Sequence, residues 1–170
     1  YKAMAAPSLK YIAGFLDADG SIQVMWRPTD RANSNPEVKR AYVSLEFSQV
    51  TAKDEVLYRI RDVIGGSVYP SKKNGKYSVL KVWGRDAEMC INRMRRFLVI
   101  KRHYLDVVMD MHKKPHNVVE AKKRLKQERK VRSLPLPNFP TRGWLAGYFD
   151  GDGSISVRIG KGRSSAQPTT

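Results

Sequence analysis

An eleven-residue segment occurs twice in this chain, and no other feature limits the possible folds as strongly. The first copy is IAGFLDADGSI at residues 12–22, and the second is LAGYFDGDGSI at residues 145–155. Seven of the eleven positions are identical, and the other four exchange residues of similar character. The two copies lie much farther apart than the period of a solenoid repeat. The chain is therefore predicted to contain two related units, each opening on the same helix.

Small residues interrupt the apolar helix of each copy. They are Ala13 and Gly14 in the first copy and Ala146 and Gly147 in the second. A glycine inside a helix costs about 1 kcal/mol relative to alanine, and close contact between two helix backbones offsets that cost. We therefore expect the two helices to pack on each other across a pseudo-twofold axis, with these four residues at the interface.

Each helix ends in two aspartates, where the helix dipole disfavours negative charge. They are Asp17 and Asp19 in the first copy and Asp150 and Asp152 in the second. If the helices lie side by side, Asp19 approaches Asp152, and like charges at short range require a cation between them. Mg²⁺ fits because it prefers carboxylate, water and phosphate oxygens. The pattern predicts metal-assisted hydrolysis of a phosphodiester.

The charge balance indicates the partner. Among 170 residues, 32 Lys and Arg oppose 16 Asp and Glu, which gives a net charge of +16 and a pI near 10.1. Such a balance is typical of nucleic-acid binding, although a ribosomal-type or merely soluble basic protein shares it. No apolar run reaches the roughly 18 residues of a membrane span. The single cysteine, Cys90, excludes a disulfide within the chain, and the three histidines have no cysteine partners for zinc.

Two other interpretations of the aspartate segments were weighed. In a calcium-binding loop, Phe15 or Tyr148 would occupy the first ligand position, and neither supplies a carboxylate. In an ordinary helix C-terminus, Gly20 would adopt the left-handed conformation and the aspartates would be solvated. Two near-identical copies in a strongly basic chain favour the metal site over both.

Hydrophobic periodicity and turn residues predict an α+β chain, with an αββαββα unit followed by the αβ start of a second unit. The predicted helices lie at 8–18, 53–64, 86–98, 101–113, 117–131 and from 142, and the strands at 21–27, 40–50, 67–72, 76–83 and 153–159. Asn74-Gly75 marks a hairpin turn, and residues 133–141 form a proline-rich linker. The first unit is assigned to residues 1–132, and residues 142–170 supply only the opening helix and strand of the second.

Residues 12–20 and 145–153 resemble the nine-residue signature of the LAGLIDADG homing endonucleases, and the Ser-Ile that follows each copy is also typical of that family. Two copies with αββαββα between them resemble the single-chain members. The resemblance implies a curved antiparallel sheet in the DNA major groove, with the paired helices beneath it. It also implies that Asp19 and Asp152 bind Mg²⁺, with Ca²⁺ or Mn²⁺ able to replace it, and that the carbonyls of Ala18 and Gly151 join the coordination.

The resemblance points to further site residues. The family places a lysine before its last helices, and Lys101 matches it as a group that stabilises charge or helps to activate water; the other interpretation is an ordinary lysine at a helix start. A polar residue at the end of the second strand orders water in the family. Gln49 is the candidate, although one alignment puts Ala52 there.

Polar and apolar residues alternate along the predicted strands, which predicts one sheet face that reads DNA. The other interpretation of this polar face is an ordinary solvated sheet surface. Turn lysines suit phosphate contacts. The predicted DNA-binding residues are Ser21, Gln23, Met25, Arg27, Arg40, Tyr42, Ser44, Glu46, Ser48, Ser67, Tyr69, Ser71, Lys72, Lys73, Lys76 and Ser78. The basic segment 117–131 is interpreted mainly as a solvated helix face rather than as a DNA contact.

The predicted function is a sequence-specific homing endonuclease that makes a Mg²⁺-dependent double-strand break in DNA. The alternative is an intron RNA maturase or a non-cleaving nucleic-acid-binding relative. The resemblance implies an intron-encoded protein inside the cell, in a chloroplast or mitochondrion. Because the second unit stops after its first strand, we expect the remainder, in this or a separate chain, to be needed for a complete enzyme.

Overall fold

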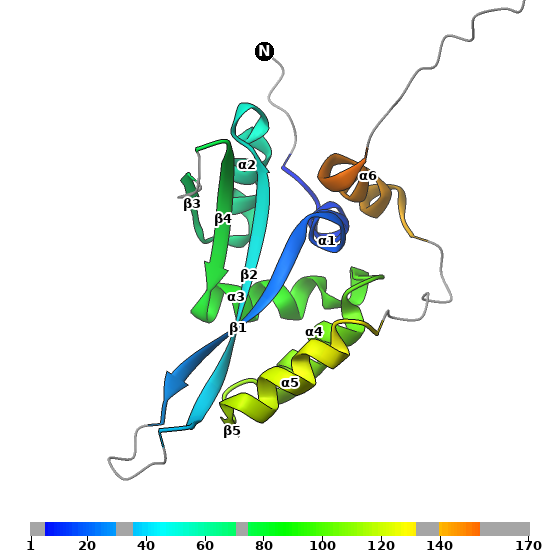
Figure 1. Ribbon diagram of the computed structural model, residues 1–170. Coiled ribbons are helices and arrows are strands. Elements are labelled where there is room, and N and C mark those ends of the chain that lie inside the picture. The colour runs from blue at the N-terminus through cyan, green and yellow to red at the C-terminus, as the bar shows by residue number, and fades with distance from the viewer. Residues whose placement is uncertain (1–5, 30–35, 71–74, 132–139, 154–170) are drawn as a thin grey trace, which may run out of the picture.

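The computed structural model describes residues 6–29, 36–70, 75–131 and 140–153, and it has the αββαββα order that the sequence predicts (Figure 1). The helices are α1 (Leu9–Ala18), α2 (Glu55–Ile64), α3 (Gly84–Met94), α4 (Arg102–Met111), α5 (Val118–Glu128) and α6 (Arg142–Asp152). The strands are β1 (Gly20–Pro28), β2 (Val38–Val50), β3 (Ser67–Pro70), β4 (Tyr77–Trp83) and β5 (Pro115–Asn117). Short 3₁₀ turns lie at Thr51–Lys53 and Arg95–Phe97.

The strands form one antiparallel sheet in the order β1-β2-β4-β3. Alternation along β2 decides which face is covered, because Ala41, Val43, Leu45 and Phe47 are all at most 1% exposed. Helices α1 to α4 pack on that face and close the core (Figure 1). The opposite face, called the outward face below, carries the polar residues of β1 and β2 and no described helix covers it.

Both repeat helices begin in the same way. The Ser8 hydroxyl accepts a hydrogen bond from the Tyr11 amide at 3.3 Å, and the Thr141 hydroxyl accepts one from the Trp144 amide at 3.2 Å. A hydroxyl at the N-cap satisfies an amide that has no partner within the helix. The repeat therefore extends to the capping residue, which fixes the start of both helices at matching positions.

The register of β4 differs from the predicted one. Leu80 and Val82 are fully buried, so Ser78 shares their inward face, is 3% exposed and donates its hydroxyl to Asp54 at 2.6 Å. The prediction that Ser78 faces DNA is wrong. Lys76 lies just before β4 and is exposed, so its contact with DNA stays a prediction. The Asn-Gly turn indicated a hairpin but did not determine which β4 residues face outward.

The strand β5 has no counterpart in the predicted elements. It pairs with residues 38–40 of β2. Between this pairing and the end of β4 at Trp83, which pairs with Ser44, His112 fills the gap. Its Nδ1 accepts a hydrogen bond from the Val43 amide at 3.2 Å, and its Nε2 lies 3.2 Å from Glu88 Oε1. The central strand thus keeps hydrogen-bond partners where no neighbouring strand is present.

Helix α6 packs on α1, on the side away from β2 and β4 (Figure 1). The predicted strand 153–159 lies outside the described residues after its first position, as does the linker apart from residues 140 and 141. None of the helices in the described part of the chain has the length and apolar character needed to cross a lipid bilayer.

Candidate active site

The crossing of α1 and α6 depends on one glycine from each helix. A Cβ atom on Gly14 would overlap the Trp144 carbonyl and lie 2.9 Å from the Tyr148 amide nitrogen. A Cβ atom on Gly147 would overlap the Tyr11 carbonyl and lie 3.0 Å from the Phe15 nitrogen. Tyr11 and Phe15 occupy the repeat positions of Trp144 and Tyr148, so the two clashes are the same contact seen from either side. The helices therefore meet backbone to backbone across a pseudo-twofold axis, as an isologous contact does.

The alanines beside these glycines lie elsewhere. Ala13 is fully buried in the core of the first unit, whereas Ala146, at the matching position, is exposed. Residues adjacent on a helix point in different directions, so an alanine next to a crossing glycine faces away from the crossing. The crossing is consequently made by Gly14 and Gly147 alone of the four small residues predicted there. Ala13 and Ala146 lie on the helix faces that point away from the crossing.

Asp19 and Asp152 lie at the C-terminal ends of the paired helices, and both are exposed. Partial burial raises the pKa of Asp19, and the nearby charge of Asp152 raises it further. A hydrogen bond from the Ser48 hydroxyl, 3.3 Å from Asp19 Oδ2, and the charge of Lys101 act in the opposite direction. Ser48 was predicted to touch DNA, but the antiparallel register places it opposite Asp19. Gly20 has no positive φ and begins β1, which rules out the left-handed cap considered above.

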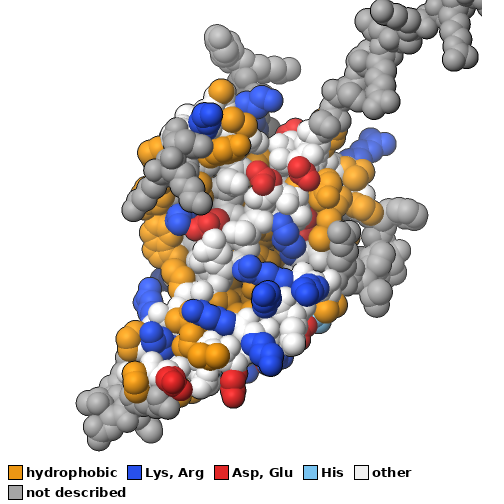
Figure 2. Space-filling view, in the orientation of Figure 1, with side chains coloured by type: hydrophobic (Ala, Val, Ile, Leu, Met, Phe, Trp, Pro, Cys, Tyr) orange, Lys and Arg blue, Asp and Glu red, His pale blue; other side chains and the backbone are white. Residues whose placement is uncertain are grey.

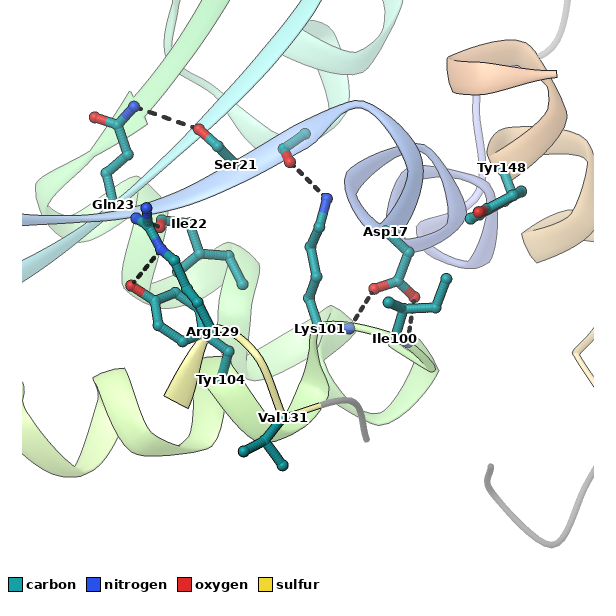
Figure 3. A pocket seen from close by; sticks show the side chains of 11 residues that line it. Asp17, Ser21, Ile22, Gln23, Ile100, Lys101, Tyr104, Arg129, Val131 and Tyr148 are labelled. Atoms are coloured by element: carbon teal, nitrogen blue, oxygen red, sulfur yellow. Dashed lines mark hydrogen bonds between the residues drawn. The ribbon is translucent and has the colours of Figure 1, made fainter. Parts of the chain in front are cut away.

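Lys101 is turned toward the end of α1. Its ammonium donates hydrogen bonds to the carbonyls of Leu16 at 2.6 Å, Ala18 at 3.2 Å and Gly20 at 2.6 Å. The bond to Gly20 is drawn in Figure 3. Burial lowers the pKa of Lys101, while the charges of Asp17, Asp19 and Asp152 oppose that shift. An ammonium has three protons, and all three have acceptors here. Lys101 thus places a positive charge near Asp19 and Asp152. It also compensates the partial negative charge at the C-terminal end of α1.

Asp17 is the site residue that the sequence analysis left without a role. It is 3% exposed, and its carboxylate accepts four hydrogen bonds, of which those from Ile100 and Lys101 are drawn in Figure 3. Three come from the backbone amides of Val99 at 2.7 Å, Ile100 at 3.2 Å and Lys101 at 2.8 Å, and the fourth comes from Trp144 Nε1 at 2.9 Å. Asp17 therefore holds the loop that carries Lys101.

The matching carboxylate in the second copy is held by the first helix. The Tyr11 hydroxyl donates to Asp150 Oδ2 at 2.7 Å, as the Trp144 indole donates to Asp17. Burial and the Asp150 carboxylate together raise the pKa of Tyr11 well above its ordinary value. Each helix thus supplies the hydrogen-bond donor for a carboxylate of the other helix.

Gln49 reaches the second helix rather than the outward face. Its Nε2 donates to the Asp150 carbonyl at 3.3 Å, and its Oε1 accepts the Val50 amide at 2.8 Å. Ala52 lies in the 3₁₀ turn that follows and is exposed. Of the two candidates for a polar residue near the helix ends, only Gln49 has a polar side chain, and it lies beside α6.

The groups at the helix ends fit a hard divalent cation. Asp19 and Asp152 are both exposed, and partial burial together with the charge of Asp152 raises the pKa of Asp19. The Ala18 carbonyl, which accepts a hydrogen bond from Lys101, directly precedes Asp19. Gly151 lies against Ala18, since a Cβ atom on Gly151 would be 2.7 Å from the Ala18 Cβ. Among the described residues, no cluster of three or more His, Cys, Asp or Glu could enclose a metal. This donor set suits Mg²⁺, which keeps several waters and accepts phosphate oxygens.

The outward face of the sheet is continuous across four strands, because directly paired residues share a face. Arg27 lies over the Tyr42 ring, 4.9 Å from its centroid, and Lys81 pairs with Glu46 at 2.5 Å. The predicted members on this face are Ser21, Gln23, Met25, Arg27, Arg40, Tyr42, Ser44, Glu46, Ser48, Ser67 and Tyr69, to which the structure adds Tyr77, Val79, Lys81 and Trp83. Ser44 is only 6% exposed, so its side chain is covered by its neighbours on this face. Ser71, Lys72 and Lys73 lie outside the described residues.

A second basic region lies over α5, where Lys and Arg side chains gather in Figure 2. Lys122 and Lys126 line an open cavity of about 440 Å³ together with Val24 and Trp26 of β1. Val24 and Trp26 alternate with the outward-facing residues of β1. This basic region is therefore on the covered side of the sheet, and it is separate from the outward face.

The sequence matches the family model described as LAGLIDADG endonuclease over residues 12–109, which is more than half of the chain. The chain belongs to the LAGLIDADG endonuclease family. No curated protein matches it.

Solved structures of homing endonucleases share the fold. I-GzeII in complex with its DNA target has a TM-score of 0.58 at 16% identity, covering 85% of this chain and 58% of that one. I-CpaMI bound to uncleaved DNA has a TM-score of 0.60 at 16% identity, with coverages of 85% and 58%. I-SmaMI bound to uncleaved DNA with calcium has a TM-score of 0.59 at 16% identity, with coverages of 92% and 62%. This chain thus spans less than two thirds of the length of these structures.

Proposed function

We propose that this protein is a sequence-specific homing endonuclease that makes a double-strand break in DNA with the help of a divalent metal ion. The observation that carries the proposal is the meeting of Asp19 and Asp152 at the ends of two helices that cross at Gly14 and Gly147. A site built only to bind DNA has no need for two facing carboxylates beside a strongly basic surface.

Asp19 and Asp152, with the carbonyls of Ala18 and Gly151, are the groups that would hold Mg²⁺. When bound, the ion supplies Lewis-acid stabilisation of the phosphate and lowers the pKa of a bound water. Ser48 holds the Asp19 carboxylate through its hydroxyl. Lys101 compensates the negative charge beneath the site and keeps the end of α1 in place. Gln49 holds the end of α6 through the Asp150 carbonyl.

The outward face is proposed to read double-stranded DNA. A two-stranded ribbon fits the major groove, and side chains on one face reach base edges. The strands β1 and β2 present serine, glutamine, arginine and tyrosine side chains there, which can donate and accept hydrogen bonds. The structures of the related I-GzeII and I-SmaMI hold those proteins on DNA targets, which agrees with this assignment.

A second sheet unit is proposed to cover the far face of α6. Leu145 is 50% exposed and Phe149 is 45% exposed, whereas the matching residues of α1, Ile12 and Leu16, are fully buried beneath the sheet. Apolar side chains at these positions are stabilised by burial, at about 25 cal/mol per Å². The unit can come from the same chain or from a separate one.

The test uses the protein as its gene encodes it. Double-stranded DNA with a randomised segment is bound, recovered and sequenced, and the selected DNA is incubated with Mg²⁺ or with EDTA. We expect a defined target, cleavage of both strands with Mg²⁺ and none with EDTA. Asp19→Asn and Asp152→Asn should each abolish the double-strand break while leaving DNA binding in place.

Two outcomes would contradict the endonuclease. If DNA is still cleaved after both Asp19→Asn and Asp152→Asn, these aspartates do not hold the catalytic metal ion. Tight binding to folded intron RNA, with no cleavage of any selected DNA, would support the RNA maturase in its place.

A further inference from the structure

The loop at residues 98–101, between the 3₁₀ turn Arg95–Phe97 and α4, has almost no regular hydrogen bonding of its own. Three consecutive amides, those of Val99, Ile100 and Lys101, donate to the single carboxylate of Asp17. A buried amide that loses its partner costs roughly 1–3 kcal/mol. The course of this loop therefore depends on one side chain of α1.

The same carboxylate also receives a donor from α6. Trp144 Nε1 donates to Asp17 Oδ2, the oxygen that the amides of Val99 and Ile100 also reach. Trp144 is 6% exposed, and its ring stacks on Tyr148 with the centroids 4.8 Å apart. The indole can reach Asp17 only while α6 lies in the glycine crossing. The hydrogen bonding of Asp17 thus depends on whether α6 is packed against α1.

We propose that Asp17 and Trp144 are positioning residues that make the placement of Lys101 depend on the packing of α6 against α1. The connection runs from the indole to the carboxylate, then to the loop amides, and ends at the Lys101 ammonium beneath Asp19. The first unit alone leaves the loop with one donor fewer on its anchoring carboxylate. The inference rests on the proposed function, which gives the placement of Lys101 its purpose.

Hydrogen exchange at the loop amides tests this connection without DNA or metal. In Trp144→Phe, which keeps an aromatic ring but loses the indole N–H, the amides of Val99, Ile100 and Lys101 should exchange about tenfold faster or more. Trp144→Tyr should restore slow exchange, because the repeat itself uses a tyrosine hydroxyl at Tyr11 to reach Asp150. Tyr11→Phe is the matched control, since it removes the sister bond and should leave the loop amides unchanged.

A second measurement avoids any change at residue 144. In a Trp26→Phe/Trp83→Phe protein, the Trp144 indole N–H gives the only indole resonance, and its exchange can be followed in low urea. We expect it to exchange with the same free energy and urea dependence as the amides of residues 99–101, as one cooperative unit does.

Several results would overturn the proposal. They are unchanged loop exchange in Trp144→Phe, failure of Trp144→Tyr to restore it, an equal effect in Tyr11→Phe, or an indole N–H that exchanges independently of the loop. In the complete enzyme, Trp144→Phe should slow cleavage at saturating DNA and leave DNA affinity unchanged. If the variants do not show the expected exchange rates but the complete enzyme cleaves DNA, only the positioning role is contradicted. If the variants show the expected exchange rates but the complete enzyme cleaves no DNA, only the endonuclease function is contradicted.

Discussion

The two aspartates of the first signature have different surroundings because the helix points them in different directions. Residues two apart on a helix point in nearly opposite directions, so Asp17 turns into the protein and Asp19 turns out of it. Asp17 meets four donors and serves as an anchor. Asp19 meets a second carboxylate, and its charge is therefore available for a cation.

The raised pKa of Asp19 has a consequence for stability. Its folded pKa lies above the ordinary 3.8, so the folded state holds this proton more tightly than the unfolded state does. This group favours folding below pH 3.8, and the contribution is lost as the pH rises through the folded pKa. In metal-free buffer at pH 7, Asp19→Asn should melt higher than the unchanged protein, by at most about 3 °C because the site is exposed. The gain should vanish below pH 3.8 in a thermal melt.

Asp110→Asn is the control for this prediction. The Lys114 ammonium holds the pKa of Asp110 below its ordinary value, so the same substitution there should not raise the melting temperature at pH 7. A matching rise in both variants would show that the effect does not come from the partial burial of Asp19 and the nearby charge of Asp152.

The sequence predicted the exposed half of this site and missed the buried half. Asp19, Asp152 and Lys101 lie together as residue spacing and family resemblance imply. The role of Asp17 was missed because its partners, the amides of residues 99–101, lie far away in sequence. The helical period was the available signal, since it separates Asp17 from Asp19 by face. Ser48 was recoverable in the same way, by extending the β1–β2 register one residue beyond the Gly20–Phe47 pair.

Helix α1 and helix α6 tolerate no side chain at their crossing. Gly14→Ala and Gly147→Ala each place a methyl group against the other backbone, which cannot move as a side chain can. Each should lower the free energy of unfolding by roughly 1–3 kcal/mol, as overpacking does, measured by urea denaturation. In Gly143→Ala, also on α6, the new Cβ lies 3.3 Å from the Lys10 Cβ, 3.4 Å from the Ser8 hydroxyl and 3.8 Å from the Tyr11 nitrogen. This substitution should change stability by no more than about 1 kcal/mol in either direction; equal losses at all three positions would contradict the crossing.

The register of β4 gives a prediction that separates folding from DNA binding. Ser78 points inward to Asp54, so Ser78→Ala should lower the free energy of unfolding by about 0.5–1.5 kcal/mol and leave the affinity for the selected DNA unchanged. Lys81 points outward beside Glu46, so Lys81→Ala should weaken DNA binding by about 1–3 kcal/mol. Gel-shift titrations and urea melts of both variants measure this, and the reverse pattern would show that Ser78 faces DNA, as the sequence had predicted.

The elements were predictable where a local signal existed. Alternation placed β2 correctly because every second residue from Ala41 to Phe47 is apolar, and the repeated segment placed α1 and α6. The β5 pairing and the His112 contact to the Val43 amide carried no such signal. They depend on distant parts of the chain coming together, which periodicity does not report.

At the scale of the whole molecule, the positive charge is divided between two faces. Only the outward face is expected to contact DNA, because α5 lies on the covered side of the sheet. Arg27→Ala should therefore reduce the slope of log K against log salt concentration by about 0.9, the value for one lost phosphate contact. Lys126→Ala removes the same charge beside Val24 and Trp26 and should leave that slope unchanged. Fluorescence anisotropy across a salt series measures both, and a reduced slope for Lys126→Ala would assign α5 to the DNA flanks.

The crossed hydrogen bonds from Tyr11 to Asp150 and from Trp144 to Asp17 limit how this protein can be recombined. A half grafted from a relative must bring its own glycine for the crossing and, just before its signature, an aromatic residue that ends in an N–H or O–H. A phenylalanine there would keep the aromatic packing but would leave the carboxylate of the recipient half with one hydrogen-bond donor fewer. The residue before each signature is therefore a compatibility marker, which can be checked in the sequence of any intended donor before a chimera is built.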